Sequence, residues 1–220
     1  MKLDLHIHSR HSRDASGSPK EILGRCRKAG LDGLAITDHN AIDGSLEAFS
    51  VARAEGLVVV RGVEVSAIEG HLLAYGVGEL IPKGLSVAET IDKIHSAGGV
   101  CVAAHPKRFP SGIGLGLARS GKFDAIEIIN SGSSARSNRL ARRVAEQKGC
   151  AVTAGSDAHA LDQVGRAYTI VDVASSEDDV VEAIRKGLTR AGGRSRTSSE
   201  GARYSWETLV EWLRGDFKRL

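Results

Sequence analysis

The sequence opens with two histidines that could bind a metal ion together. His6 and His8 end a short run in which apolar and polar residues alternate, as in a half-buried strand. Residues i and i+2 of a strand point to the same side, so the two imidazoles are expected to lie next to each other. Neutral imidazole nitrogens are common metal ligands. Taken alone, the pattern also fits a strand with two structural histidines.

The same pattern recurs further along the chain. Each time, an apolar, strand-like run ends in an acidic residue or a histidine. The ends of these runs are Asp38-His39, Glu64, His105 and Asp157-Ala158-His159. Imidazole and carboxylate ligands together suit zinc, manganese or iron. Strands that repeatedly end in such residues predict a metal centre where the strand ends meet.

Helices are expected between these strands, which gives an α/β fold. We expect strands at 3–8, 34–37, 58–63, 71–77, 100–104, 125–130, 151–156 and 165–173, and helices at 18–29, 43–55, 86–97, 135–148 and 176–186. Such regular alternation implies parallel strands joined by right-handed crossovers. No Gly-x-Gly-x-x-Gly follows the first strand, which disfavours a dinucleotide-binding sheet. Ligands confined to strand ends favour a barrel, whose active sites collect at the C-terminal ends of the strands.

Composition places the chain among soluble globular proteins. It has 220 residues, of which 41% are apolar and 26% charged. No run approaches the roughly 20 apolar residues of a membrane span. The first residues also lack the basic and apolar segments of a signal peptide, so we expect a cytoplasmic protein. Cys26, Cys101 and Cys150 lie far apart, and we expect them to be reduced.

The C-terminal end differs from the rest in charge and composition. From Arg185 to Leu220 there are 9 Lys and Arg against 4 Asp and Glu, whereas the preceding residues carry 21 and 23. A solvated basic tail and an anionic partner both fit this asymmetry. We expect a barrel over 1–190, a Gly-, Ser- and Arg-rich linker over 191–203, and an amphipathic helix over 204–220. That helix is expected to pack on the barrel, with an oligomer contact as the alternative.

The ordered set of strand-end motifs resembles the PHP (polymerase and histidinol phosphatase) family. The matching stretches are His6-x-His8, Thr37-Asp38-His39, Gly62-Val63-Glu64, Ala104-His105-Pro106 and Ser156-Asp157-Ala158-His159. The resemblance covers residues 1 to about 173. It implies a distorted (β/α)7 TIM-like barrel, to which the helical spacing of the last residues adds a C-terminal helical extension. It also implies a cluster of two or three divalent metal ions (Mn, Zn or Fe) that hydrolyses phosphate esters, the EC 3.1 class.

Transferred position by position, the resemblance implies three metal-binding groups. In order, these are His6, His8 and Asp157; His71 and His105; and Asp14, His39 and His159. Glu64 would join the first group and bridge it to the second. Asp14 stands where relatives carry either Asp or His, so the resemblance supports the third group less than the other two.

Phosphate esters are anionic and repel an unassisted hydroxide. Two metal ions can neutralise that charge, generate hydroxide near neutral pH and stabilise the departing oxygen. Arg108 follows His105 closely and is expected to clamp a phosphate through a bidentate contact. Arg13 and Lys107 are weaker candidates for the same role. No side chain is predicted as the general acid.

Other polar residues near the strand ends are expected to support the site. Asp38 is expected to orient an imidazole rather than to bind metal. Glu127 and Asn130, at the end of the 125–130 strand, either line the pocket or serve the fold. His11 and His95 are interpreted as ordinary surface or helix residues.

Three alternatives remain open for the function. An amidohydrolase-type barrel also begins with His-x-His but usually bridges its metals with a lysine, where this chain has Glu64. A histidinol-phosphate phosphatase belongs to the same family, although nothing marks imidazole recognition. A regulatory metal-binding module without turnover is the third. Residues 78–85 are too few for the subdomain that relatives acting on nucleotides and on RNA 5′ ends often carry, which argues against base recognition by such an insert and suggests an open mouth. The expected substrate is a phosphorylated small molecule, a nucleotide or a nucleic-acid end.

Overall fold

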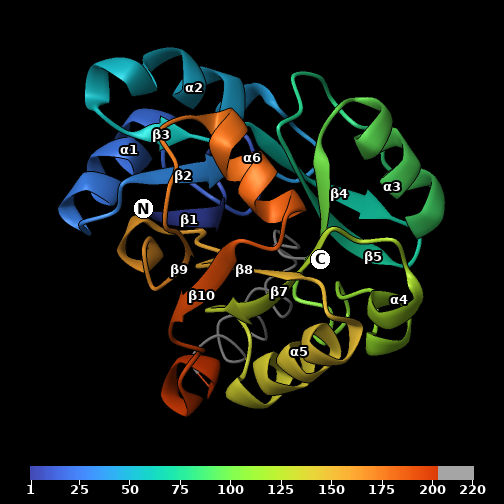
Figure 1. Ribbon diagram of the computed structural model, residues 1–220. Coiled ribbons are helices and arrows are strands. Elements are labelled where there is room, and N and C mark those ends of the chain that lie inside the picture. The colour runs from blue at the N-terminus through green and yellow to red at the C-terminus, as the bar shows by residue number, and fades with distance from the viewer. Residues whose placement is uncertain (203–220) are drawn as a thin grey trace.

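The computed structural model describes residues 1–202, apart from the side chain of Arg53. Its strands form two five-stranded sheets, and helices cover their outer sides (Figure 1). The strands are β1 (Lys2–Ile7), β2 (Gly33–Ile36), β3 (Val58–Val59), β4 (Gly62–Ala67), β5 (Gly70–Tyr75), β6 (Val100–Ala103), β7 (Ala125–Asn130), β8 (Ala151–Gly155), β9 (Ala167–Val171) and β10 (Thr189–Gly193). The first sheet has the order β10-β9-β1-β2-β3 and the second β4-β5-β6-β7-β8.

The helices lie close to where the sequence predicts them. They are α1 (Pro19–Lys28), α2 (Asp43–Glu55), α3 (Val87–Ser96), α4 (Leu115–Ser120), α5 (Ala135–Lys148) and α6 (Glu177–Arg185), with a 3₁₀ turn η1 (Leu161–Gln163). The serine before α1, α3, α5 or α6 accepts a hydrogen bond from a backbone N–H of the first turn. Each such cap stabilises its helix by about 1 kcal/mol, which is why the sequence indicates where these helices start.

The expected strand over 58–63 is wrong, because the chain forms two short strands there. β3 pairs in parallel with β2, whereas β4 pairs with β5 in the other sheet. The break falls at Arg61, whose backbone N–H donates to Oε1 of Glu177 at 2.7 Å instead of to a neighbouring strand. The Arg61 guanidinium pairs with the same carboxylate. This contact spans 116 residues, so no local pattern indicates it.

The expectation of parallel strands throughout is also wrong in part. β1/β2, β2/β3, β6/β7 and β7/β8 pair in parallel, as expected. β5 is antiparallel to both β4 and β6, and β9 is antiparallel to β1 and β10. Only Ile68 and Glu69 separate β4 from β5, and so short a connection permits a hairpin but no crossover.

The two sheets enclose a common core without forming one continuous closed ladder. Isolated bridges connect them: Ile7 of β1 pairs with Ala158, after β8, and His39, after β2, pairs with Glu64 of β4. One cluster of buried side chains draws on both sheets and on α6, and it includes Leu5, Tyr75, Val102, Ala125 and Ile184. α6 lies across one end of this core (Figure 1). The fold is therefore a mixed α/β fold with two sheets.

The C-terminal region departs from the expected linker. Thr189–Gly193 form β10, paired with β9, so the first residues of the 191–203 segment belong to a strand. The amphipathic helix expected over 204–220, and the oligomer contact assigned to it, lie outside the described residues. Over residues 1–202, no helix combines the length and the apolar character that crossing a membrane requires.

Candidate metal centre

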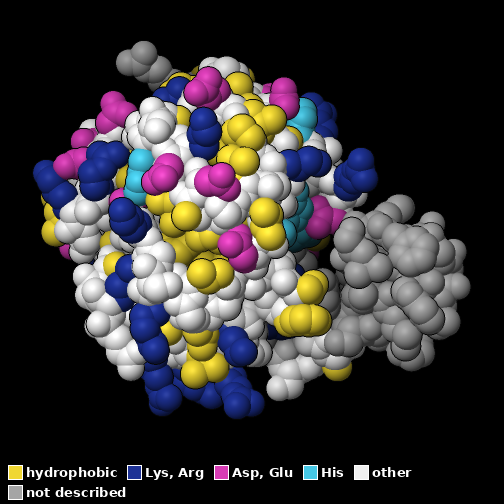
Figure 2. Space-filling model, turned by 90° about the vertical axis from the view of Figure 1, so that its right-hand side faces the viewer, with side chains coloured by type: hydrophobic (Ala, Val, Ile, Leu, Met, Phe, Trp, Pro, Cys, Tyr) yellow, Lys and Arg dark blue, Asp and Glu magenta, His cyan; other side chains and the backbone are white. Residues whose placement is uncertain are grey.

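The residues predicted as metal ligands lie together at one end of the two sheets. They come from β1, β4, β5 and the loops that follow β1, β2, β6 and β8: His6, His8, Asp14, His39, Glu64, His71, His105, Asp157 and His159. Most are buried, and Asp14, His39, His71 and His159 are partly exposed. Figure 2 shows histidine side chains recessed in the molecular surface. The cluster is therefore accessible from solvent on one side.

The Glu64 carboxylate lies in the middle of this cluster and is fully buried. Nitrogens of five imidazoles lie 2.9–3.3 Å from its two oxygens: those of His6, His8 and His39 at Oε2, and those of His71 and His105 at Oε1. A carboxylate that presents each oxygen to a different set of imidazoles can be shared by two metal ions. The geometry thus fits the bridging position implied for Glu64.

Asp157 and Asp14 face the imidazoles on the other side of the cluster. Oδ1 of Asp157 lies 3.2 Å from Nε2 of His8 and 3.7 Å from Nδ1 of His159. Oδ2 of Asp14 lies 3.0 Å from Nε2 of His159 and 3.6 Å from Nε2 of His39. Asp14, the member that the resemblance supports least, thus contacts both of its expected companions.

The spacing of these atoms fits metal coordination. Four groups of three have ligand atoms within 4.8 Å of one another: His6, His8 and Asp157; His6, Glu64 and His105; His39, Glu64 and His71; and His8, His39 and His159. Ligands about 2.0–2.2 Å from one ion lie about 3.0–3.6 Å apart, close to the separations seen here. The overlapping groups fit more than one ion.

Glu127 fixes the orientation of the His6 ring. Its Oε1 lies 2.9 Å from Nδ1 of His6, and its Oε2 accepts hydrogen bonds from the backbone N–H of His105 and from Nδ2 of Asn130. With the proton of neutral His6 on Nδ1, the Nε2 lone pair points at Glu64 and Asp157. Such a carboxylate–imidazole pair is the usual outer support of a metal-binding histidine.

Ser12 and Asp38 do the same for His8. The Ser12 hydroxyl donates its one proton to Oδ1 of Asp38, so it can only accept from Nδ1 of His8, 3.2 Å away. The proton of neutral His8 then lies on Nδ1, and its buried Nε2 has no hydrogen-bond partner among the described residues. An unpartnered lone pair facing two carboxylates is unfavourable unless a cation lies between them. Asp38 thus contacts the His8 ring only through Ser12, so its expected role in orienting an imidazole stays a prediction.

The electrostatics of the cluster keep its carboxylates ionised. Burial alone would raise the pKa of Glu64, but His39 and His6 hold it well below its ordinary value. Burial acts likewise on Asp157, and Arg108 and His6 hold its pKa well below the usual range. Burial would lower the pKa of His6, whereas Glu127, Asp157 and Glu64 raise it well above the ordinary value. The carboxylates are thus held in the ionised form that binds a metal cation.

Comparison with known proteins identifies the family. The sequence model of the PHP domain matches residues 4–81, and that of the PHP-associated region matches residues 135–189. The two matches include β1 to β5 and the segment from α5 to the start of β10. The chain belongs to the PHP family. The family resemblance inferred from the strand-end motifs is thereby confirmed.

Curated relatives of this PHP chain align over parts of its length. An uncharacterized protein of Methanocaldococcus jannaschii is 40% identical over 116 residues, 48% of this chain and 68% of the relative. A 3′,5′-nucleoside bisphosphate phosphatase of Chromobacterium violaceum is 36% identical over 84 residues, 36% of this chain and 29% of that protein. A phosphoribosyl 1,2-cyclic phosphate 1,2-diphosphodiesterase of Eggerthella lenta is 32% identical over 100 residues, 42% and 38% of the two chains.

Solved structures share the fold of the PHP chain. A two-domain protein of Bacteroides vulgatus, containing a predicted PHP-like metal-dependent phosphoesterase, superimposes with a TM-score of 0.74 and 20% identity, covering 88% of this chain and 65% of that one. A lesion-specific endonuclease of Pyrococcus furiosus gives a TM-score of 0.67 and 15% identity, covering 93% and 66%. At these identities the likeness concerns the fold alone.

The predicted phosphate-binding residues of the PHP chain differ in position. Arg108 is partly buried, and its guanidinium Nη1 donates to Oδ2 of Asp157 at the edge of the ligand cluster. Gly132 makes room for this contact, because a Cβ there would lie 3.0 Å from both atoms. Arg13 and Lys107 are exposed and, among the described residues, form no ion pair with the cluster. Arg108 is the candidate that the structure brings to the site.

Several residues that support the PHP site were missed from the sequence. Ser9 donates its backbone N–H and its hydroxyl to Asp38. Asp4, fully buried in β1, accepts backbone N–H groups of Ser156 and Gly165 and so ties β1 to the chain around β8. The inward position of Asp4, two residues before His6, is the signal that could have found it.

The backbone is strained where two of the expected ligands lie. His105 has φ of 27° and Asp157 φ of 54°, both in the left-handed region that non-glycine residues avoid. Asp157 is held there by its backbone N–H, which donates to the His6 carbonyl at 2.7 Å. Strained residues cluster at functional sites, where the surrounding structure fixes them.

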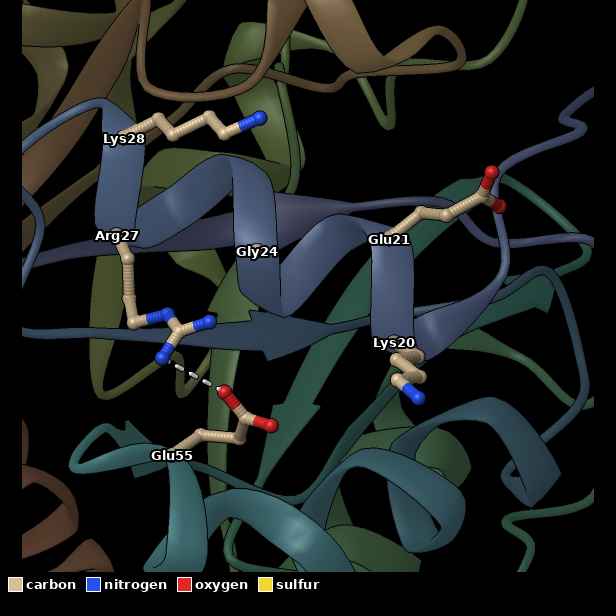
Figure 3. Close-up of a pocket in the computed structure, with 6 residues that line it drawn as sticks. All are labelled: Lys20, Glu21, Gly24, Arg27, Lys28 and Glu55. Carbon is tan, nitrogen blue, oxygen red and sulfur yellow. Dashed lines mark ion pairs between the residues drawn. The ribbon is translucent and has the colours of Figure 1, made fainter.

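A surface pocket lies elsewhere, between α1 and α2. It is lined by Lys20, Glu21, Gly24, Arg27, Lys28 and Glu55. Arg27 pairs with Glu55 at 2.9 Å across it (Figure 3). None of the predicted site residues line this pocket. Side-chain chemistry rather than concavity marks the site of this PHP chain.

Glu127→Gln should weaken metal binding about 10- to 100-fold, as loss of an outer partner of a metal-binding histidine usually does. The neutral amide would accept less strongly than the carboxylate from the donors at the backbone of His105 and at Asn130. It would also lack the negative charge that stabilises a metal-bound imidazole. Calorimetric titration of the metal-free protein with Mn²⁺ or Zn²⁺ measures the change. Glu79→Gln, at an exposed residue, is the matched control. Unaltered affinity would remove Glu127 from the metal centre.

Proposed function

We propose that this PHP chain is a metal-dependent phosphoesterase that uses two or three divalent ions, of Mn, Zn or Fe. The single observation that carries the proposal is the buried Glu64 carboxylate with five imidazoles around it. Such a centre suits the hydrolysis of an anionic ester better than a structural role, because its metal-facing side stays accessible. We interpret the two sheets as halves of a distorted (β/α)7 barrel whose C-terminal mouth holds this centre.

The proposed ligands divide into three groups around Glu64. In order, these are His6, His8 and Asp157; His71 and His105; and Asp14, His39 and His159. When bound, the ions would supply charge neutralisation and Lewis acidity. Glu64 is proposed to belong to the first two groups, since its two oxygens face different imidazoles.

The chain's own residues would position the ester. Arg108 lies beside Asp157, and we propose that its guanidinium binds the oxygens of the phosphate. Glu127 and Ser12 hold protons at Nδ1 of His6 and His8, which keeps both Nε2 atoms available as ligands. The relatives' activities, a bisphosphate phosphatase and a cyclic phosphodiesterase, support phosphoester hydrolysis as the reaction class. A phosphorylated small molecule or a nucleic-acid end is the proposed substrate.

The test is hydrolysis of a chromogenic phosphate monoester and the matching diester by the Mn²⁺-loaded protein, side by side. We expect turnover of at least one ester, and loss of that turnover in His105→Ala. Hydrolysis of the monoester alone would define a phosphatase, and diester cleavage a phosphodiesterase or nuclease. No turnover with Mn²⁺, Zn²⁺ or Fe²⁺ would contradict the proposal and favour a metal-binding module or an amidohydrolase-type reaction.

A further inference from the structure

An aromatic side chain stands in solvent beside the metal centre without an obvious role in the fold. Phe109 is 96% exposed, the most exposed large apolar side chain among residues 1–202. It directly follows Arg108, whose guanidinium contacts Asp157. Exposed apolar side chains are common singly, so the exposure of Phe109 gains weight only from its place on the loop that follows His105, because binding residues concentrate on loops held by a rigid scaffold.

The loop that carries Phe109 is tightly held. The backbone N–H of Arg108 donates to the carbonyl of His105 at 2.8 Å, and that of Gly114 donates to the carbonyl of Pro106 at 2.9 Å. Gly112 packs so closely that a Cβ there would lie 2.7 Å from two carbonyl oxygens of the loop. A ring on such a loop is presented to solvent by a fixed backbone, so its exposure is a property of the fold.

The backbone of Phe109 lies close to that of the expected ligand His105. A hydrogen-bonded turn keeps its ends within about 7 Å, which brings the Cα of Arg108 near that of His105. The next Cα is about 3.8 Å further on, so the Cα of Phe109 lies within about 11 Å of that of His105. A side chain that starts at this distance is within the reach of a nucleotide whose phosphate is bound at the centre.

The β4–β5 hairpin contacts this loop and carries a second exposed apolar side chain. The backbone N–H of His71 donates to the carbonyl of Ser111 at 2.9 Å, which fixes the hairpin against the loop. Ile68, at the hairpin tip, is 73% exposed. The loop and the hairpin that carries the partly exposed His71 thus each present an apolar side chain to solvent.

We propose that Phe109 is the stacking surface for a nucleobase, so that the substrate is a nucleoside phosphate, free or at a nucleic-acid end. The proposal rests on the proposed phosphoesterase function and deepens it. Arg108 would hold the phosphate and Phe109 the base, through two adjacent residues of one loop. Aromatic stacking accepts any base, because every base has a flat π face. The site therefore selects for a base without selecting its identity.

The test compares a nucleoside 5′-monophosphate with ribose 5-phosphate, which offers the same ester without the base. In Phe109→Ala, the ratio of kcat/KM for the two substrates should fall about 5- to 150-fold, the range that loss of base stacking gives. Phe109→Tyr should restore the ratio. Val173→Ala, at a side chain that is 90% exposed but distant in sequence from the centre, is the control and should leave the ratio unchanged.

Calorimetric binding of the same two compounds supplies a readout that needs no turnover. An equal loss on both compounds in Phe109→Ala, or an unchanged ratio, would overturn the proposal. A 5′-phosphorylated oligonucleotide, compared with the free nucleotide, tells which of the two the site accepts. Phe109→Ala should weaken binding of that form. Selective binding without any hydrolysis would contradict the proposed function while leaving the base-binding role of Phe109 in place.

Discussion

Glu64→Gln is expected to reduce hydrolysis by at least about a hundredfold, because loss of an outer partner alone costs 10- to 100-fold at metal sites. The substitution keeps the shape of the side chain but removes the charge that five imidazoles surround. An amide also offers only one oxygen, so the sets of imidazoles at Oε1 and Oε2 could no longer share a carboxylate. We expect both bound metal and activity to fall together.

Metal content after dialysis, measured by mass spectrometry alongside activity, checks this result. Glu79→Gln makes the same chemical change on the surface and should retain full metal content. A Glu64→Gln protein that keeps its metals and its turnover would show that the carboxylate does not bridge them. If the protein kept its metals but lost turnover, Glu64 would instead bind or position the substrate.

Gly155→Ala is expected to destabilise the metal-free protein by about 3 kcal/mol, at the upper end of what overpacking a core costs. Gly155 ends β8 where that strand passes β1. A Cβ at this position would lie 2.3 Å from the Cβ of His6 and 2.7 Å from its backbone nitrogen. Because these are backbone or near-backbone atoms, the two strands would have to move apart and the ligand His6 would move with them.

Urea unfolding of the metal-free protein measures this effect separately from metal binding. Gly24→Ala is the matched control, since Gly24 lies inside α1 and a Cβ there would have no heavy atom of a neighbouring segment within 4 Å. That substitution should stabilise the protein by about 0.5–1 kcal/mol, the usual preference for alanine in a helix. Equal effects at the two glycines would contradict the close approach of β8 to β1.

The parts of the fold that the sequence predicted are those with local causes. The bounds of α2, α5 and β7 match the expected ranges, because capping serines, glycine stops and apolar runs mark them. The break between β3 and β4 was missed because the partner of Arg61 is Glu177, far along the chain. The antiparallel pairing of β5 was missed because strand–helix alternation was extended across a connection too short to hold a helix.

The expected metal ligands of the candidate site could be predicted from the sequence, whereas most residues that hold them in place could not. Most of the expected ligands end apolar strands and can be read from one sequence, whereas Asp14 and His71 came from the family resemblance. The structure brings all nine side chains together. Ser12 and Ser9 could not be found this way, since they act through a loop whose shape depends on the buried Asp38. Arg13 and Lys107 were chosen for charge alone, and the structure leaves both exposed.

The most direct test of the central claim is to remove and restore the metals in the unaltered protein while following phosphoester hydrolysis. Chelation should abolish turnover, and titration with Mn²⁺ should restore it, with activity saturating once two or three ions are bound per chain. Turnover that persists after complete removal of metal would contradict a metal-dependent phosphoesterase centred on Glu64. So would full activity at one ion per chain, because a bridging carboxylate would then have nothing to bridge.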